Sequence, residues 1–314
     1  MEVLIDPGQG PCAPPGTVVT VGAYDGVPVG HQGLIQRVRE RAAARGVPSA
    51  VVTFDRHPAT VVRPDSAPKL LTDLDQKVEL LGDTGIDLCV VLTFDAKRSE
   101  ESAPEFVREV LVGCLQAGVV VVGTDFHFGH ARQGNVTLLE QMGRELGFEV
   151  DGVDPLPEPE GRTAVSSTRI RDLVSAGKVD EAATLLGRLY EVRGQVERGD
   201  GRGGPVLGYP TANIAVPHDI LLPAEGIYAG WYERPDRSVH QTAISLGRRP
   251  QFYDHADAPL LEAYLLGFSG HLYGEQARVR FVARLREDRR FSSVDELVAQ
   301  TGRDVDAVRA LLVG

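Results

Sequence analysis

The sequence contains few cysteines, and they are far apart. Cys12, Cys89 and Cys114 are the only three in 314 residues, and no two of them have Cys-x-x-Cys spacing. The wide separation of the three cysteines indicates neither a disulfide framework nor a structural zinc site. Apolar neighbours favour buried thiols for Cys89 and Cys114.

Long hydrophobic runs and a secretion signal are also lacking. No segment approaches the roughly 18 apolar residues of a membrane span. The first residues, MEVLIDPGQGPCAPPG, have neither the basic start nor the apolar core of a signal peptide. We therefore expect a cytoplasmic protein in a reducing compartment, with no membrane partner.

An excess of positive charge is lacking as well. The 33 Lys and Arg residues are outnumbered by 44 Asp and Glu residues, which gives a formal charge of −11. Proteins that bind nucleic acids through their phosphates carry the opposite sign, so we expect no nucleic-acid partner. Hydrophobic residues make up 42% of the chain, enough for ordinary cores, and the length suggests two domains of roughly 100–200 residues each.

The first half alternates apolar strands with amphipathic helices. We expect strands at 18–21, 50–54, 88–92 and 119–122, and helices at 32–45, 70–81, 103–116 and 135–146. Thr72 and Asp75 have capping-box spacing in the second helix, as have Ser102 and Glu105 at the third. Strands that are apolar throughout are covered on both faces, so this half predicts a parallel sheet between two layers of helices.

The second half has a different pattern. After a proline-rich linker at 152–161 and helices at 166–175 and 179–186, short alternating segments lie between glycines and prolines. We expect strands at 190–196, 227–232, 239–245, 260–266 and 277–285, enough for a small antiparallel barrel, and a final helix at 294–312. The predicted fold class is α/β followed by β, with domains at 1–186 and 187–314.

The first candidate functional segment runs from Val21 to His31 and joins a strand to a helix. Gly22 and Gly30 would let a phosphate approach the backbone, while the helix N-terminus and His31 would add donors. A glycine-rich turn with a helix-capping histidine explains this segment alone equally well.

The second candidate is Ser166-Ser167-Thr168-Arg169-Ile170-Arg171. Hydroxyl groups at the start of a helix usually cap it, but with two arginines in the next turn they could also hold a triphosphate. Both candidates lie on crossovers of one parallel sheet, and such sheets bind ligands at the carboxyl ends of their strands.

Two further candidates lie in the second half. In Gly208-Tyr209-Pro210-Thr211-Ala212-Asn213, proline stiffens the chain, so Thr211 and Asn213 point the same way and offer two neutral oxygens that suit magnesium. A strand start with an asparagine in a turn is the alternative. Glu262, in the largely apolar segment LLEAYLL, could serve as a general base; the alternative is a solvent-facing strand glutamate.

Together these segments resemble the bifunctional prokaryotic FAD synthetases, which combine a riboflavin kinase with an FMN adenylyltransferase. VTVGAYDGVPVGHQGLI, TFDRHP, VVGTDFHFGHARQGN and VSSTRIR are similar, in order, to landmarks of the family's nucleotidyltransferase. GYPTANI, EGIYAGWY, SLGRRPQF and LLEAYLLGFSGHLYG resemble its kinase module. The resemblance implies a Rossmann-like nucleotidyltransferase domain followed by a β-barrel riboflavin kinase domain with a C-terminal helix.

The resemblance also implies two reactions and the residues that carry them. In the kinase, Thr211 and Asn213 would hold Mg²⁺ and the ATP phosphates, and Glu262 would take a proton from riboflavin as FMN forms. In the adenylyltransferase, His31 would help to position ATP for attack by the FMN phosphate, and this reaction gives FAD. The other nucleotide-binding residues implied by the motifs are Gly22, Asp25, Gly30, Ser167, Thr168, Arg171 and Gly208.

Two departures from the family pattern concern the adenylyltransferase. The family loop reads His-x-Gly-His, but Pro28 stands at its first position, and Ala164 replaces an arginine, with Arg162 two residues away. Losing one donor to a developing phosphate charge costs roughly 10²–10³ in rate. We therefore expect a competent riboflavin kinase joined to a slow or inactive adenylyltransferase. A fully bifunctional enzyme and a non-catalytic flavin- or nucleotide-binding protein are the alternatives.

Overall fold

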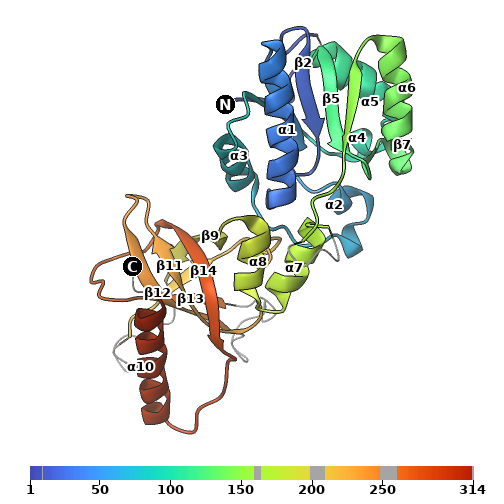
Figure 1. The fold of residues 1–314 in the computed structure, drawn as a ribbon. Coiled ribbons are helices and arrows are strands. Elements are labelled where there is room, and N and C mark those ends of the chain that lie inside the picture. The colour runs from blue at the N-terminus through green and yellow to red at the C-terminus, as the bar shows by residue number, and fades with distance from the viewer. Residues whose placement is uncertain (9, 159–163, 199–208, 248–259, 313–314) are drawn as a thin grey trace. The chain divides into compact units, whose positions relative to one another are not determined.

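A computed structural model of the chain describes residues 1–8, 10–158, 164–198, 209–247 and 260–312 (Figure 1). By its contacts the chain forms two compact units, Met1–Ser167 and Thr168–Gly314, and each unit has a sheet of its own. Helix α8 (Val179–Leu186) and nearly all of helix α7 (Ser167–Ser175) group with the second unit. A domain boundary after residue 186 remains a prediction.

A six-stranded parallel sheet forms the centre of the first unit, with strand order β1-β4-β3-β2-β5-β8. The strands are β1 (Glu2–Ile5), β2 (Thr17–Val21), β3 (Ser49–Phe54), β4 (Leu88–Leu92), β5 (Ala117–Gly123) and β8 (Glu149–Val153). The main helices are α1 (Val29–Arg45), α3 (Leu74–Asp83), α5 (Ala103–Phe106), the π-helical segment η2 (Val107–Cys114) and α6 (Val136–Leu146). Shorter elements are α2 (Ala59–Val62), η1 (Pro64–Ser66), α4 (Ala96–Glu100), β6 (His127–Phe128), η3 (His130–Arg132) and β7 (Gly134–Asn135). The strand order reverses between β2 and β5, where open parallel sheets bind ligands beyond the carboxyl ends of the strands.

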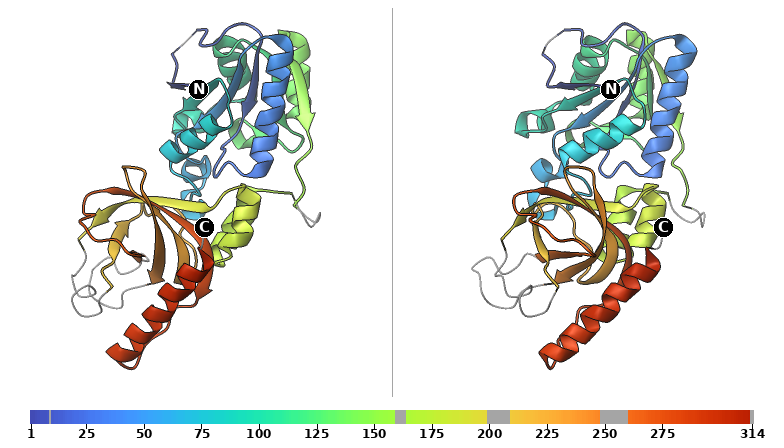
Figure 2. Two further views of the ribbon diagram at one scale, coloured as in Figure 1. Left: turned by 60° about the vertical axis from the view of Figure 1, so that its left-hand side comes forward. Right: turned by 90° about the vertical axis from the view of Figure 1, so that its left-hand side faces the viewer.

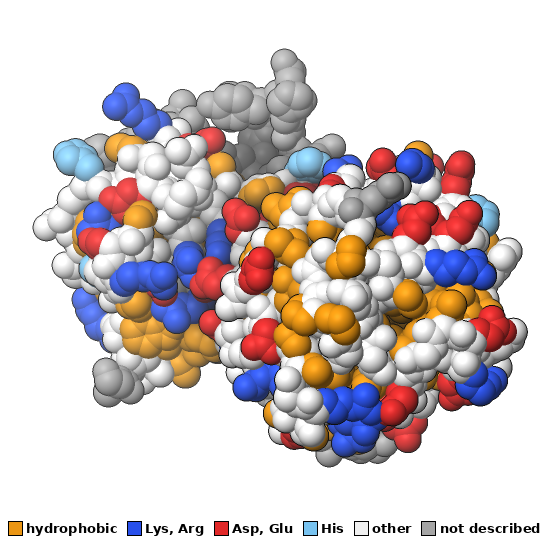
Figure 3. Space-filling model, turned by 90° about the horizontal axis from the view of Figure 1, so that it is seen from above, with side chains coloured by type: hydrophobic (Ala, Val, Ile, Leu, Met, Phe, Trp, Pro, Cys, Tyr) orange, Lys and Arg blue, Asp and Glu red, His pale blue; other side chains and the backbone are white. Residues whose placement is uncertain are grey.

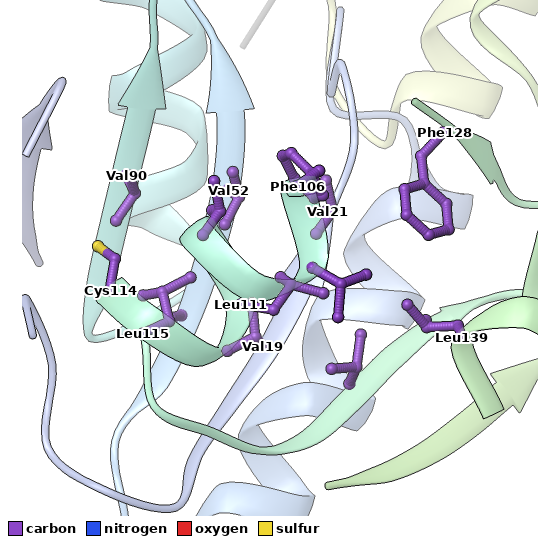
Figure 4. Close-up of a cluster of buried hydrophobic side chains, with 14 of the residues drawn as sticks. Val19, Val21, Val52, Val90, Phe106, Leu111, Cys114, Leu115, Phe128 and Leu139 are labelled. Atoms are coloured by element: carbon purple, nitrogen blue, oxygen red, sulfur yellow. The ribbon is translucent and has the colours of Figure 1, made fainter. Parts of the chain in front are cut away.

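Two hydrophobic cores lie on opposite faces of this sheet. Helices α1 and α3 cover one face, where Ile35 and Leu81 are buried against the strands (Figure 1). The segment η2 and helix α6 cover the other face, with Leu111 and Leu139 in the cluster drawn in Figure 4. Successive residues of the central strands alternate between the two cores. This double burial explains the uninterrupted apolar strands and confirms the predicted parallel sheet.

Side-chain caps mark the starts of helices α3, α4, α5 and α6 of this unit. Asn135 accepts a hydrogen bond from the Leu138 amide at the start of α6, and Gly147 ends that helix in the left-handed conformation. Ser102 and Glu105 form the predicted capping box of α5. Both helix starts were therefore readable from the sequence.

The predicted start of the second helix is wrong. Helix α3 begins at Leu74 and is capped by Asp73, whose side chain accepts a hydrogen bond from the Gln76 amide. Thr72 does not cap the helix, because its hydroxyl group donates to Asp25 Oδ1 over 3.1 Å. Thr72 therefore makes a long-range contact with Asp25 in place of the helix cap that the capping-box spacing predicted.

Cys12 and Cys114 form a disulfide, which corrects the prediction of a free thiol at Cys114. The two residues are 102 positions apart, so their spacing did not reveal the pair. The Cys12 amide also donates to the Cys114 carbonyl group over 2.7 Å. The bond ties the segment between β1 and β2 to the end of η2. Cys89 is a buried free thiol, as predicted.

A closed antiparallel barrel forms the centre of the second unit (Figure 2). Its strand order is β10-β13-β12-β11-β14-β9. The strands are β9 (Tyr190–Glu197), β10 (Ala212–Ala215), β11 (Gly226–Glu233), β12 (Val239–Gly247), β13 (Leu260–Leu265) and β14 (Gln276–Arg286). Helix α10 (Val294–Leu311) contributes Val308 to a small cluster with Ala229 of β11, and Leu312 follows in the same cluster. The predicted barrel with a C-terminal helix is confirmed.

Acidic and basic side chains lie intermingled on the face shown in Figure 3. The ion pairs of the first unit include Arg45 with Glu149 at 2.6 Å and Arg37 with Asp151 at 3.0 Å. Within the described part of the chain, no helix is long and apolar enough to cross a membrane.

Candidate functional site

The loop between β2 and α1, residues 22–28, is held in a strained shape. Tyr24 and Val27 have φ angles of +49° and +39°, which residues other than glycine rarely adopt. The Tyr24 hydroxyl group lies 2.7 Å from Thr20 Oγ1, and a Cβ at Gly22 would lie only 3.0 Å from the Tyr24 ring. Such strain persists where surrounding contacts enforce it, and it is frequent at functional sites.

The carboxylate group of Asp25 is buried and accepts hydrogen bonds from other residues of the first unit. The residue is 4% exposed, and its carboxylate accepts hydrogen bonds from the Leu71 amide (3.0 Å), the Thr72 amide (3.1 Å) and the Thr72 hydroxyl group (3.1 Å). These contacts tie the loop to the segment before α3. A nucleotide-binding role for Asp25 stays a prediction.

His31 lies in the first turn of α1, and its side chain contacts the same loop. Its ring packs edge-on against Tyr24, with 5.0 Å between the ring centroids. Burial lowers the pKa of His31 to about 4, although the Asp25 charge acts in the opposite direction. The ring atom Nδ1 is buried without a hydrogen-bond partner in the described part of the chain. At neutral pH this side chain is therefore an uncharged imidazole that can serve as a hydrogen-bond donor.

The start of the second predicted phosphate-binding segment, up to Ser167, contacts the first segment within the first unit, whereas Thr168–Arg171 group with the second unit. Ser167 Oγ donates to the Asp25 carbonyl oxygen over 2.7 Å. A Cβ at Gly30 would lie 3.2 Å from the Val165 carbonyl oxygen, so glycine lets the hydroxyl-rich segment approach the start of α1. Helix α7 begins at Ser167 and carries Thr168 and Arg171.

A recess beside the loop contains residues that the sequence interpretation missed. Its lining consists of Ala23 and Asp25 from the loop, Asp55, Arg56 and His57 after β3, and Leu70, Thr72, Leu74 and Lys77 from the α3 region. The recess opens to solvent, and its volume of about 20 Å³ is on the scale of a single water molecule. The signal available in the sequence was the charged run that directly follows the buried strand β3.

In the second unit, strand register sets Asn213 directly opposite Glu262. The two residues pair across the antiparallel strands β10 and β13, where opposed Cβ atoms lie about 4.5–5.5 Å apart on one face. Both are half-buried, while their strand neighbours are buried, so they belong to the outer face of the barrel. Ser245 of β12 and Glu197 of β9 continue this row on either side.

Thr211 precedes β10 and shares the face of Asn213, because alternate residues of an extended chain point the same way. Just before it, the Tyr209 ring packs edge-on against Tyr264 of β13, with 5.2 Å between the ring centroids. This contact anchors the proline-stiffened segment beside the Glu262 strand. Of the other predicted positions, Gly208 and Arg162 lie outside the described residues.

Comparisons with known proteins agree with both halves of this arrangement. Residues 11–169 match the FAD synthetase family, and residues 186–312 match the riboflavin kinase family. A bifunctional riboflavin kinase/FMN adenylyltransferase of Pseudomonas fluorescens is 37% identical, over 94% of this chain and 93% of its own. Its counterpart in Listeria monocytogenes is 36% identical, over 93% and 91%. This chain belongs to the bifunctional riboflavin kinase/FMN adenylyltransferase family.

Membership of the riboflavin kinase/FMN adenylyltransferase family confirms the resemblance drawn from the motifs. The second half of the chain is a riboflavin kinase, and the protein is an enzyme of flavin biosynthesis. Riboflavin, FMN and ATP are the substrates that this family implies. Among solved structures, a Streptococcus pneumoniae protein described as a macrolide-efflux protein is 28% identical, with a TM-score of 0.86 over 98% of this chain and 99% of its own. The two proteins share a fold.

Proposed function

We propose that Glu262 is the general base for phosphorylation of riboflavin in the second unit. Glu262 would accept the proton of the ribityl 5′-hydroxyl group while that oxygen attacks the γ-phosphorus of ATP. The bond between the γ-phosphorus and its bridging oxygen breaks, and ADP leaves as FMN forms. The register of Glu262 with Asn213 supports this proposal, because it sets a carboxylate beside the oxygen atoms that would hold the nucleotide.

Thr211 and Asn213 would hold magnesium together with the ATP phosphates. A hydroxyl and an amide oxygen are hard, neutral donors, and magnesium usually takes few such protein ligands besides phosphate oxygens. The described residues contain no group of three or more His, Cys, Asp or Glu side chains that could hold a metal ion. The bound ion would neutralise phosphate charge, while the two side chains orient the nucleotide toward Glu262.

Replacing Glu262 tests this proposal in the full-length protein. We expect Glu262→Gln to lower the kcat of FMN formation by about 10²-fold or more, because the amide cannot accept the hydroxyl proton. Riboflavin and ATP should still bind with affinities within a few-fold of the wild type, as measured by calorimetry. Glu191→Gln is the control, since this glutamate pairs with Arg193 elsewhere on the barrel (2.8 Å). Full activity of Glu262→Gln would contradict the proposal.

We further propose that the first unit adenylylates FMN, but slowly. The FMN phosphate oxygen would attack the α-phosphorus of ATP, and pyrophosphate would leave. Within the first unit, Gly22, Gly30, His31 and Ser167 would position the triphosphate, and the family motif adds Thr168 and Arg171 of helix α7 to the nucleotide-binding residues. The contact of Ser167 with the loop carbonyl group supports this role, as does the buried Nδ1 of His31 that lacks a partner among the described residues. Pro28 and Ala164 occupy positions where the family pattern has donors, so less developing charge is neutralised.

Restoring the missing donors tests the rate that we propose. Pro28 has an extended backbone, with φ of −63° and ψ of 169°, which histidine also adopts. We expect Pro28→His to raise FAD formation from FMN and ATP by about 10–100-fold, and Ala164→Arg to raise it further. A wild-type rate equal to that of FMN formation would support the fully bifunctional alternative. No FAD from any variant would support a nucleotide-binding domain without catalysis.

We infer a cytoplasmic site of action from the composition of the chain and its use of ATP. The Cys12–Cys114 disulfide is the one feature of the described structure that argues against a strongly reducing environment. Alkylation of the thiols in freshly lysed cells would establish which form is present. Free Cys12 and Cys114 would support the cytoplasmic assignment.

A further inference from the structure

Lys77 is a buried lysine in the first unit that the proposed chemistry leaves without a role. The residue belongs to α3 and is 6% exposed, which is rare for lysine because burying an ammonium group is costly. Burial lowers the pKa of Lys77, while the charges of Asp25 and Asp55 raise it. Two carboxylates near a buried amine help it to keep its proton.

The ammonium group of Lys77 joins two segments that follow neighbouring strands. Nζ donates to the Phe54 carbonyl oxygen at the end of β3 over 2.6 Å. It also lies 3.4 Å from the Ala23 carbonyl oxygen in the loop after β2. Thr53 Oγ1 donates to the same Ala23 oxygen over 3.1 Å. Lys77 thus ties the loop 22–28 to the charged segment 55–57.

Both segments and Lys77 line the same recess at the carboxyl ends of β2 and β3. Both acids of the recess already have partners, because Asp25 accepts from the Leu71 and Thr72 amides, and Asp55 accepts from the Phe94 amide over 2.9 Å and from the Arg56 side chain over 2.8 Å. Lys77 lines the same recess, and its described hydrogen bonds go to backbone carbonyl groups instead. Ionisable groups that burial perturbs in a pocket are candidates for a functional role.

We propose that Lys77 is a positioning residue for the adenylylation of FMN. It holds the strained loop and the segment after β3 in one arrangement before substrates bind, so that the loop presents its amide groups to the nucleotide correctly. A displacement of about 1 Å in a catalytic arrangement can cost about 10²-fold in rate. This inference rests on the proposed activity of the first unit.

The test compares Lys77→Met and Lys77→Arg in the full-length protein. We expect Lys77→Met to lower the kcat for FAD formation by about 10²-fold while the KM values for FMN and ATP stay within about threefold. Lys77→Arg keeps donors for both carbonyl groups and should recover at least a tenth of the wild-type kcat. Riboflavin phosphorylation should be unchanged in both variants, which shows that the second unit is intact.

Lys97→Met is the matched control, because it makes the same change at an exposed lysine of α4 outside the recess. A Lys77→Met enzyme with the wild-type kcat would overturn the inference. Equal losses in the Met and Arg variants would overturn it as well, since they would indicate a packing defect.

Hydrogen exchange separates this inference from the proposed function. We expect the amides of residues 22–27 and 54–57 to exchange at least tenfold faster in Lys77→Met than in the wild type, without substrates. If the wild type makes no FAD, the proposed function fails, and the exchange result alone decides whether Lys77 orders the two segments. Unchanged exchange would overturn the inference whatever the activity.

Discussion

His31 is half-buried and Lys77 is buried near the same loop, and desolvation lowers the pKa of each. Their charged neighbours differ. His31, with a pKa of about 4, is neutral at neutral pH. Burial also lowers the pKa of Lys77, but the charges of Asp25 and Asp55 favour its protonated form. The loop that we propose to bind ATP therefore has a neutral imidazole just beyond its end in α1 and the Lys77 amino group at its Ala23 carbonyl group.

The low pKa of His31 predicts how the stability of the first unit depends on pH. The unfolded chain binds a proton on this imidazole below about pH 6.5, whereas the folded chain does so only below about pH 4. Because the unfolded state binds more protons between these values, stability is highest above pH 6.5 and falls as the pH drops toward 4. The full difference is about 3 kcal/mol, of which about 2 kcal/mol is lost by pH 5.

Hydrogen exchange of the β2 and β5 amides at pH 7 and pH 5 measures this loss, after correction for intrinsic exchange rates. We expect His31→Gln to lack the part of the pH dependence that comes from the imidazole, so the drop should be about 2 kcal/mol smaller than in the wild type. The same drop in both proteins would contradict the burial-driven shift at His31.

Sequence reasoning at the residue level identified side chains by type but not by neighbourhood. Asn213 and Glu262 were both candidates, yet only strand pairing brings them into register. Lys77 was not a candidate, because nothing in the run LDQKVELL distinguishes it from a solvent-facing lysine. Its partners are backbone carbonyl groups of other elements. Every residue has a backbone carbonyl group, so residue types alone do not identify such partners.

At the level of elements, burial on both faces made the central strands predictable, whereas the strands at the two edges of the sheet were harder to predict. Strand β8 pairs only with β5 in the described sheet and is partly exposed, so it lacks the continuous apolar run that marked β2 to β5. Strand β1 is short and mostly exposed. It was not predicted, although it pairs with β4 from Glu2 to Ile5.

The Cys12–Cys114 bond predicts a redox-dependent stability of the first unit. It closes a loop of about 100 residues, and cross-links of that size typically stabilise a fold by about 2–5 kcal/mol, mainly by restricting the unfolded chain. We expect dithiothreitol to lower the thermal midpoint of this unit by several degrees, and Cys12→Ala to do the same without reductant. Differential scanning calorimetry measures both.

Cys89→Ala provides the control for that experiment, because Cys89 is the remaining free thiol and is buried. Its variant should keep the full response to the reductant. Identical midpoints with and without reductant in the wild type would show that the bond contributes no stability. The amides of β1 should lose protection first on reduction, since the bond lies on the chain between β1 and β2.

At the level of the whole molecule, two reactions are assigned to two compact units with separate cores. The contacts that we propose for FMN formation lie on strands β10 and β13, and the loop that we propose for FAD formation lies between β2 and α1. FMN is the product of one reaction and the substrate of the other, so the two activities should be separable by substitution.

Supplying FMN directly tests this separation. We expect Glu262→Gln to form FAD from riboflavin and ATP far more slowly than the wild type, limited by its roughly 10²-fold slower FMN formation, but to form FAD from FMN and ATP at the wild-type rate. Conversely, His31→Ala should form FMN normally, while its FAD formation falls by about 10²-fold, the typical cost of one donor to developing phosphate charge. An equimolar mixture of the two variants should convert riboflavin to FAD, because FMN released by one protein can bind to the other. Failure of the mixture, with each single activity intact, would mean that His31→Ala does not release its FMN into solution.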